Sequence, residues 1–167
     1  MSVASLSRVS VAVALAFGLA LSACARNTAD DASLSGAYGG PAIGPGSIKE
    51  FSASVGDRVF FDTDVTDLNA ANQATLDKQA AWLNQYNRYT FTIEGHADER
   101  GTREYNFALG SRRAEAVKDY LIAKGVAASR VKTISYGKER PVAVCNDISC
   151  WSQNRRAVTV LAGAAGS

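Results

Sequence analysis

The chain has 167 residues, of which 47% are hydrophobic and 20% are charged, and this length leaves room for one ordinary globular domain. Lysine and arginine together number 18 against 16 aspartate and glutamate residues, so the net charge is close to neutral. A chain without a large basic excess is not typical of proteins that bind nucleic acid, and we expect no nucleic-acid partner.

The first 23 residues have the pattern of an export signal. Arg8 precedes the apolar run VSVAVALAFGLALSA, which is too short and too poorly flanked for a stable membrane span. The junction LSAC resembles the bacterial lipobox, and this resemblance implies that Cys24 becomes the lipidated first residue. Ala25 in the next position resembles lipoproteins that are sorted to the outer membrane. The alternative is an ordinary signal peptide in which Cys24 lies near the cleavage site.

A segment rich in small residues follows. Residues 24–55 are rich in Gly, Ala, Ser and Pro and show no apolar periodicity, which indicates a flexible tether. Such a tether has a root-mean-square reach on the order of 30 Å and an extended length of up to roughly 100 Å. We therefore expect the globular domain, residues 56–163, to act on something that stands off the membrane.

The globular domain shows alternating patterns of strands and helices. β-Branched, aromatic and alternating apolar residues predict strands, and apolar residues at helical spacing predict helices, the longer of which ends at Gly125. The predicted strands are 57–64, 88–96, 130–137 and 155–161, and the predicted helices are 68–86 and 102–124. Residues 138–154 are expected to be irregular. The order β-α-β-α-β-β predicts a two-layer α/β sandwich of the α+β kind, with helices on one side of a small mixed sheet.

The remaining cysteines are Cys145 and Cys150, in the segment CNDISC. Export would place them where disulfides are permitted, so we expect them to pair and to fix a local turn. Two free thiols are the main alternative. We expect no metal site, because the sole histidine is far away in the sequence and zinc normally takes four ligands.

The longer predicted helix carries a charge on its apolar face. Steps of three and four residues place on one line Asn106, Leu109, Arg113 and Val117. Because an unpaired buried charge is costly, Arg113 either extends to solvent or meets an acid, and Asp98, just after the preceding strand, is the best candidate.

Charged and polar residues would then converge where this helix begins, a region that favours anions through its free N–H groups. They are Asp98, Arg100, Asn106 and Arg113. An acid with two arginines can hold a molecule that carries both an ammonium and a carboxylate group. The alternative is a purely structural ion pair between Asp98 and Arg113.

Three segments carry a family resemblance: GHADERGTREYNFALGSRRAEAVKDYL, SYGKERP and WSQNRRAVTV. They resemble the OmpA-like peptidoglycan-binding domains, and the match covers about residues 57–162. With the lipobox and the tether, the whole chain resembles the peptidoglycan-associated lipoproteins of Gram-negative bacteria. The resemblance implies that meso-diaminopimelate of the peptidoglycan stem peptide contacts Asp98 and Arg113.

Further binding positions follow from the same resemblance. Arg100 and Asn106 match positions that line the pocket, Asp64 matches the acidic end of the first strand, and Leu109 is assigned to the same set. The chain departs from the family at Thr63, where relatives often carry phenylalanine, so one apolar wall of the pocket is expected to differ. It also departs at Gly110, where many relatives carry serine.

An enzymatic interpretation has less support. His96 is a candidate general base with Asp98 or Glu99 as its partner, but the sequence has no second histidine, no GxSxG and no HExxH pattern. Trp82 and Trp151 are candidate carbohydrate platforms, although packing at a helix or loop edge explains them more simply. We therefore predict a binding protein that is not an enzyme and needs no cofactor.

The resemblance implies a specific biological role. It predicts a lipid-anchored protein of the outer membrane whose domain faces the periplasm and tethers the membrane to the cell wall without a covalent bond. It further implies membership of the Tol-Pal system, which acts in envelope integrity and in outer-membrane constriction during division, with TolB and other Tol proteins as partners. The alternatives are an OmpA-like envelope or stator-type wall anchor outside that system, and a peptidoglycan hydrolase.

Overall fold

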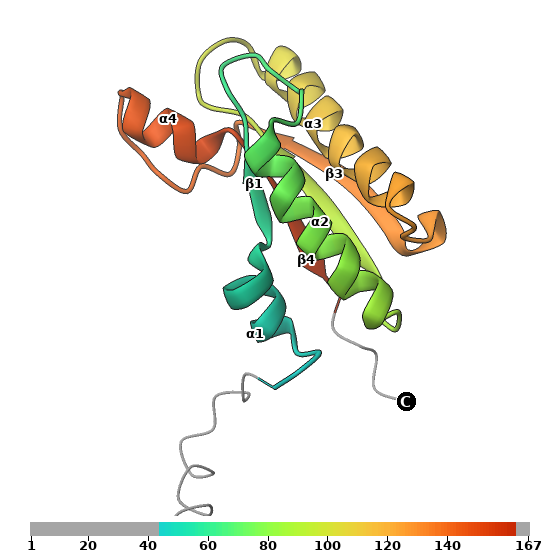
Figure 1. Ribbon diagram of the computed structural model, residues 1–167. Helices are drawn as coiled ribbons and strands as arrows, with labels where there is room; N and C mark the ends of the chain where they lie inside the picture. The colour runs from blue at the N-terminus through green and yellow to red at the C-terminus, as the bar shows by residue number, and fades with distance from the viewer. Residues whose placement is uncertain (1–43, 163–167) are drawn as a thin grey trace, which may run out of the picture. The chain divides into compact units, whose positions relative to one another are not determined.

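The computed structural model describes residues 44–162, and Figure 1 shows their arrangement. The predicted export signal, Cys24 and most of the predicted tether lie outside the described residues. Within residues 44–162 there is no helix of the length and apolar character that a membrane crossing requires.

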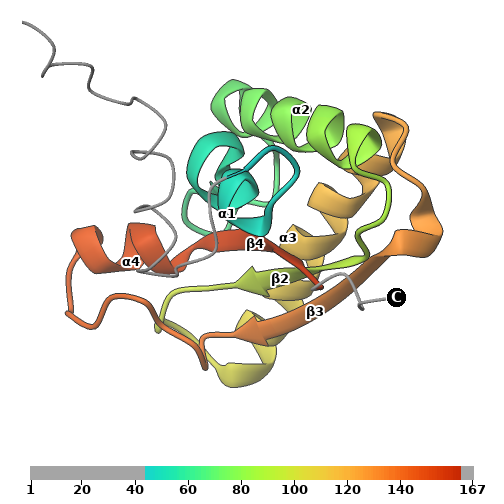
Figure 2. The ribbon, with the colours of Figure 1, turned by 90° about the horizontal axis from the view of Figure 1, so that it is seen from below.

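A mixed sheet forms one layer of the domain (Figures 1 and 2). Its strands are β1 (Arg58–Phe60), β2 (Phe91–His96), β3 (Val131–Gly137) and β4 (Arg156–Leu161). The four strands lie in the order β1-β4-β2-β3, with β4 antiparallel to both of its neighbours and β2 parallel to β3. The predicted small mixed sheet is confirmed. The first strand is shorter than predicted, because the chain turns away at residues 62–65, where Asp64 has a φ of 57°.

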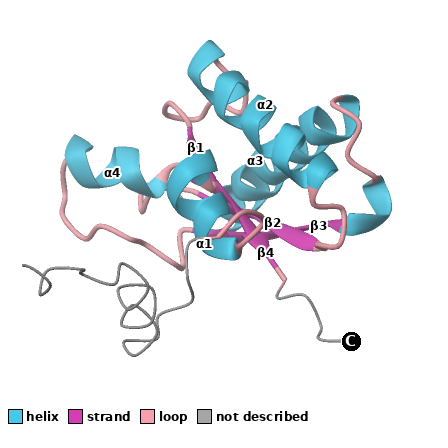
Figure 3. Cartoon of the chain, turned by 60° about the horizontal axis from the view of Figure 1, so that its bottom comes forward, coloured by secondary structure: helices cyan, strands magenta, loops and turns pink. Residues whose placement is uncertain are grey.

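Two helices, α2 (Ala70–Gln85) and α3 (Arg103–Ala123), lie on one side of the sheet, as Figure 3 shows. The bounds of α3 agree with the prediction: the Thr102 hydroxyl accepts a hydrogen bond from the N–H of Tyr105, and Gly125 has a φ of 91° just beyond the helix. The side chains between helices and sheet form the core. They include Leu76, Leu83, Phe91, Ile93, Val117 and Leu121.

The helix α3 crosses β2 at two glycines. A Cβ atom on Gly95 would lie 1.8 Å from the carbonyl oxygen of Gly110, and one on Gly110 would lie 2.4 Å from the Ser135 hydroxyl. Any side chain would therefore force the helix away from the strand. A serine at position 110 would need such a shift in this chain. The close crossing brings the beginning of α3 next to the loop that follows β2.

The segment before β1 is helical, which corrects the predicted extent of the tether. The helices α1 (Ile48–Glu50) and η2 (Phe51–Gly56) occupy it. Phe51 is 1% exposed and its ring lies 4.9 Å from that of Trp82, whose indole N–H donates to Glu50 at 2.8 Å. The prediction of a tether was therefore wrong for residues 48–55.

The chain is also fastened just before α1. The carbonyl oxygen of Gly46 accepts hydrogen bonds from the Tyr89 hydroxyl and from Arg88, both at 2.7 Å. Tyr89 lies two residues before β2, one of the two inner strands of the sheet, so the beginning of the described chain is joined to the segment that leads into that strand.

The segment between β3 and β4 contains another helix that was not predicted, α4 (Ile148–Asn154). It lies at the end of the sheet where β4 begins (Figure 2). The prediction of an irregular segment was wrong for these residues. The disulfide between Cys145 and Cys150 is present, with a Cα–Cα distance of 5.6 Å, so the predicted pairing is confirmed. Asp147 caps the helix by accepting from the N–H of Ser149 at 2.7 Å.

Candidate functional site

The loop after β2 places Asp98 among arginines. Arg100 donates to both carboxylate oxygens of Asp98, from Nε to Oδ1 at 3.0 Å and from Nη2 to Oδ2 at 2.7 Å, and its backbone N–H also donates to Oδ1. Arg155, which directly precedes β4, donates to Oδ2 from the other side at 3.3 Å. Asp98 itself is buried.

These contacts fix the charge of Asp98. Burial by itself would raise the pKa of this carboxyl group, but the hydrogen bonds from Arg100 and Arg155 outweigh it, and the pKa lies below its usual value. The bond to Asp98 likewise raises the pKa of Arg100. The site therefore holds a carboxylate and guanidinium groups in their charged forms at neutral pH.

A hollow of about 190 Å³ lies beside this cluster. The residues that line it are Thr63, Asp64, Asp98, Arg100, Gly101 and Tyr105. Arg100 donates to the Thr63 hydroxyl at 3.2 Å, and the Tyr105 hydroxyl donates to Asp64 at 3.2 Å. The first contact joins the turn after β1 to the loop after β2, and the second joins the same turn to the beginning of α3. The hollow is therefore formed by segments that are distant in the sequence.

Some of the predicted binding residues line the hollow, and others are buried behind it. Asp64, Asp98 and Arg100 line the hollow. Asn106 is buried behind it and donates to the carbonyl groups of Arg100 at 2.7 Å and Thr102 at 3.0 Å, so it holds the loop in place. Leu109 is buried one turn further along α3 and is not among the lining residues.

Arg113 lies beneath the turn after β1 and is 0% exposed. Its guanidinium group donates to backbone carbonyl groups at 2.8–3.0 Å; these belong to Asp62, Val65 and His96. Burial, followed by the nearby charge of Arg155, lowers the pKa of Arg113 to about 10. Among residues 44–162, Asp98 forms ion pairs with Arg100 and Arg155 and none with Arg113. The prediction that Arg113 pairs with Asp98 was therefore wrong. Carbonyl dipoles compensate the Arg113 charge instead.

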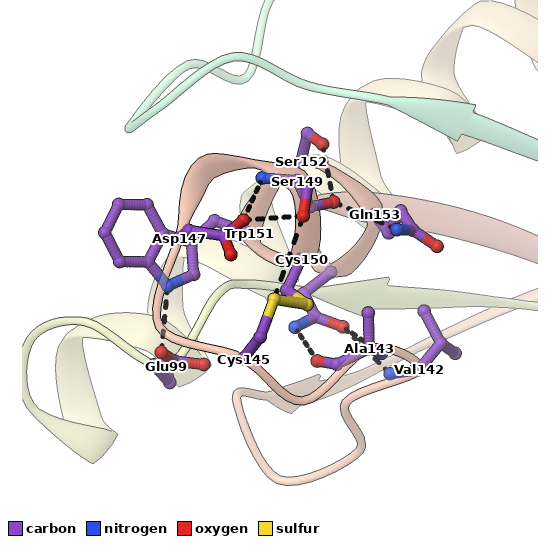
Figure 4. The surroundings of a disulfide bond; sticks show 11 residues. Glu99, Val142, Ala143, Cys145, Asp147, Ser149, Cys150, Trp151, Ser152 and Gln153 are labelled. Atoms are coloured by element: carbon purple, nitrogen blue, oxygen red, sulfur yellow. Dashed lines mark hydrogen bonds between the residues drawn. A yellow bond between two sulfur atoms is a disulfide. The ribbon is translucent and has the colours of Figure 1, made fainter.

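Sequence reasoning missed Arg155, Tyr105 and the contact made by Trp151. Arg155 is buried and donates to the carbonyl oxygen of Phe61 at 2.9 Å as well as to Asp98, so it ties β1 to the site. The sequence signal that could have indicated Arg155 is the arginine pair at the beginning of an apolar strand, Arg155 just before β4 and Arg156 as its first residue. The indole N–H of Trp151 donates to the Glu99 carboxylate at 2.8 Å (Figure 4), a contact between residues too far apart for a local pattern to indicate.

His96 does not line the hollow. It is 2% exposed, and neither ring nitrogen has a hydrogen-bond partner among the described residues. Burial, then the charges of Arg156 and Arg140, lower the pKa of His96 from 6.5 to about 4. The imidazole is therefore neutral and enclosed. Within residues 44–162, no three histidine, cysteine or acidic side chains are grouped as metal ligands would be.

Comparisons with known proteins identify the family of the chain. The model of the OmpA family matches residues 60–155. The chain is 60% identical over 163 residues to a peptidoglycan-associated lipoprotein of Mesorhizobium japonicum, covering 97% of each chain. It is 62% identical to one of Rhizobium meliloti, covering 92% of this chain and 88% of the relative.

Solved structures give the same result. The crystal structure of the peptidoglycan-associated lipoprotein from Burkholderia pseudomallei is 40% identical, with a TM-score of 0.65 over 68% of this chain and 98% of the other. The C-terminal domain of Helicobacter pylori MotB, at 21% identity over 65% of this chain and 86% of the other, shares the fold with a TM-score of 0.61. The chain therefore belongs to the OmpA family and, within it, to the peptidoglycan-associated lipoproteins.

Proposed function

We propose that this protein holds the outer membrane to the peptidoglycan layer, and that the hollow beside Asp98 binds meso-diaminopimelate of the stem peptide. The relatives are named for their association with peptidoglycan. The observation that carries the proposal is the hollow itself, in which Asp64 and Asp98 lie beside Arg100. This combination of charges suits a ligand that presents an ammonium and a carboxylate group close together.

Binding would exchange one set of charge pairs for another. In the free protein Asp98 is paired with Arg100 and Arg155, whereas Asp64 is exposed and, among residues 44–162, receives only the Tyr105 hydroxyl. The ligand ammonium would join the two carboxylates, and the ligand carboxylate would join Arg100. Because each buried charge keeps a partner throughout, the exchange avoids the large cost of an unpaired ion.

Arg113 has a supporting part in this proposal. Arginine has five N–H donors, and the bonds from Arg113 to the three carbonyl groups leave some of them unused. Its positive charge lies under the turn that carries Asp62 and Val65, so it would attract the ligand carboxylate to this side and could add a hydrogen bond if the turn shifts. Asn106 and Leu109 would support the loop and the helix behind the ligand.

The cellular part of the proposal rests on the family resemblance of the sequence. We assign a lipid anchor to Cys24, a periplasmic position to the domain and membership of the Tol-Pal system, in which TolB would compete with the wall. Mass spectrometry of the mature N-terminus tests the anchor: a triacylated Cys24 supports it, and an uncut leader contradicts it. Release of the protein from sacculi by added TolB tests the competition.

Sedimentation with purified sacculi tests the binding site. The wild-type protein should sediment, free meso-diaminopimelate should release it, and no muropeptides should appear in the supernatant. Asp98→Asn should weaken binding by about tenfold or more, because it removes one charge of a charge-assisted pair. Asp119→Asn is the matched control, since Asp119 is exposed on α3 away from the hollow. Undiminished sedimentation of Asp98→Asn would contradict the assignment.

A further inference from the structure

The short helix α4 touches the candidate site through one side chain. The ring of Trp151 faces the guanidinium group of Arg100, with 4.3 Å between Cζ and the ring centroid. The same indole donates to Glu99 at 2.8 Å (Figure 4). Trp151 therefore contacts two consecutive residues of the loop that carries Asp98.

Arg100 is the lining residue that most needs such support. It is exposed, and a long arginine side chain loses much rotamer freedom when it is held in one place. Its bonds to Asp98 fix one edge of the guanidinium plane, and the indole covers a face of that plane. A planar guanidinium group can turn on an aromatic ring while it remains stacked, so Arg100 could release Asp98 to a ligand without leaving the hollow.

Two sets of interactions, a disulfide and the hydrogen bonds of Asn154, fix the position of Trp151. Cys150, the residue before it, is joined to Cys145 by the disulfide (Figure 4). At the other end of α4, Asn154 accepts from the N–H groups of Val142 and Ala143 at 2.8 and 3.2 Å and donates to the Ala143 carbonyl at 2.8 Å. The loop before α4 is therefore closed onto the helix at both ends.

We propose that Trp151 is a positioning residue of the peptidoglycan site, and that the Cys145–Cys150 disulfide holds its indole against Arg100. This inference rests on the proposed function, because its consequence is measured as wall binding. It gives the disulfide a role in recognition in addition to stability. It also assigns the indole to an arginine contact, and not to a carbohydrate platform.

The test compares variants of the full-length lipidated protein in detergent, by sedimentation with sacculi and by titration with meso-diaminopimelate. Trp151→Leu should bind about fivefold more weakly, the size expected for one lost cation–π contact. Trp151→Phe keeps an aromatic face and should recover most of the affinity. Replacing both cysteines with serine should weaken binding in the same direction. Ile148→Ala is the matched control, because Ile148 is 62% exposed on the same helix.

A double-mutant comparison separates positioning from a general loss of stability. In an Arg100→Ala background, Trp151→Leu should cause no further loss, because the indole acts through the arginine. An equal further loss would overturn the inference. The two indole N–H signals of the chain add a spectroscopic measure: meso-diaminopimelate should shift that of Trp151 and leave that of Trp82, bonded to Glu50 in the core, unchanged.

The outcomes for the inference and for the proposed function are distinct. If the wild-type protein and Trp151→Leu bind sacculi equally, the inference is overturned and the wall-binding function stands. If the wild-type protein does not bind sacculi at all, both are overturned. If Trp151→Leu does not fold, the affinity of Trp151→Phe and the indole shift decide the question.

Discussion

Replacing His96 with phenylalanine should remove most of the pH dependence of stability that this protein shows at mildly acidic pH. The folded protein keeps the imidazole neutral, with a pKa of about 4 against 6.5 for a free side chain, because the ring is enclosed and faces the charges of Arg156 and Arg140. Between these two values the unfolded chain binds a proton that the folded chain does not. Stability is therefore fully present above pH 6.5 and is lost as the pH falls toward the folded value.

The magnitude follows from the same difference. Each pKa unit corresponds to about 1.4 kcal/mol, so the complete effect is on the order of 3 kcal/mol. From about pH 7.5 to about pH 5, linkage predicts a loss of about 2 kcal/mol in the free energy of unfolding. Acidic groups whose pKa is lowered by folding, such as Asp98, add their own loss only at lower pH, where the unfolded carboxyl groups begin to protonate.

Urea unfolding at a series of pH values measures this loss, and His96→Phe should show a nearly flat profile over the same interval whatever its absolute stability. Because the chain has a single histidine, NMR titration of the imidazole gives the folded pKa directly. A folded pKa at or above 6.5, or an equal pH slope in His96→Phe, would refute the reasoning.

Other substitutions test the packing. Gly95→Ala should cost about 2–3 kcal/mol in urea unfolding, because the new Cβ meets the backbone of α3, whereas Gly44→Ala, which has no atom within 4 Å, should be close to neutral. Phe51→Ala should cost about 3 kcal/mol, since its ring is buried against Trp82; a cost near zero would restore the tether interpretation of this segment. Arg113→Met should destabilise by about 3 kcal/mol by leaving buried carbonyl groups without donors, while Arg112→Met on the exposed side of α3 serves as its control.

The elements that local periodicity could predict are those with a long regular pattern. The alternation around Ile93 and the helical stripe through Val117 each reflect one buried face, so sequence was sufficient for them. The helices before β1 and before β4 depend on single aromatic residues that pack far away along the chain: Phe51 contacts Trp82, and Trp151 contacts Glu99. No local pattern contains those contacts.

The candidate site shows the same division. The family motif located Asp98 and Arg100 together, and the structure brings both into the hollow with Asp64. The helical stripe correctly predicted that the Arg113 side chain points into the protein, but periodicity does not identify the polar groups that it meets there. The partners proved to be backbone carbonyls of the turn after β1, and Arg155 took the place beside Asp98. Every residue has a main-chain carbonyl group, so the sequence does not show which of them accept hydrogen bonds from Arg113. The sequence therefore could not predict that carbonyl groups, and not Asp98, are the partners of Arg113.

The fastening of Gly46 to Tyr89 determines how the domain would carry a load. Tyr89 lies two residues before β2 and Asp98 two residues after it, so tension between an N-terminal membrane anchor and a wall ligand, as proposed above, would run lengthwise along this strand. The strand is hydrogen-bonded on both sides, to β3 and to β4. The inter-strand hydrogen bonds of β2 lie across the direction of pulling, so a force along the strand would load all of them together in shear. They could not break one after another, as they would if the strand were peeled from its end.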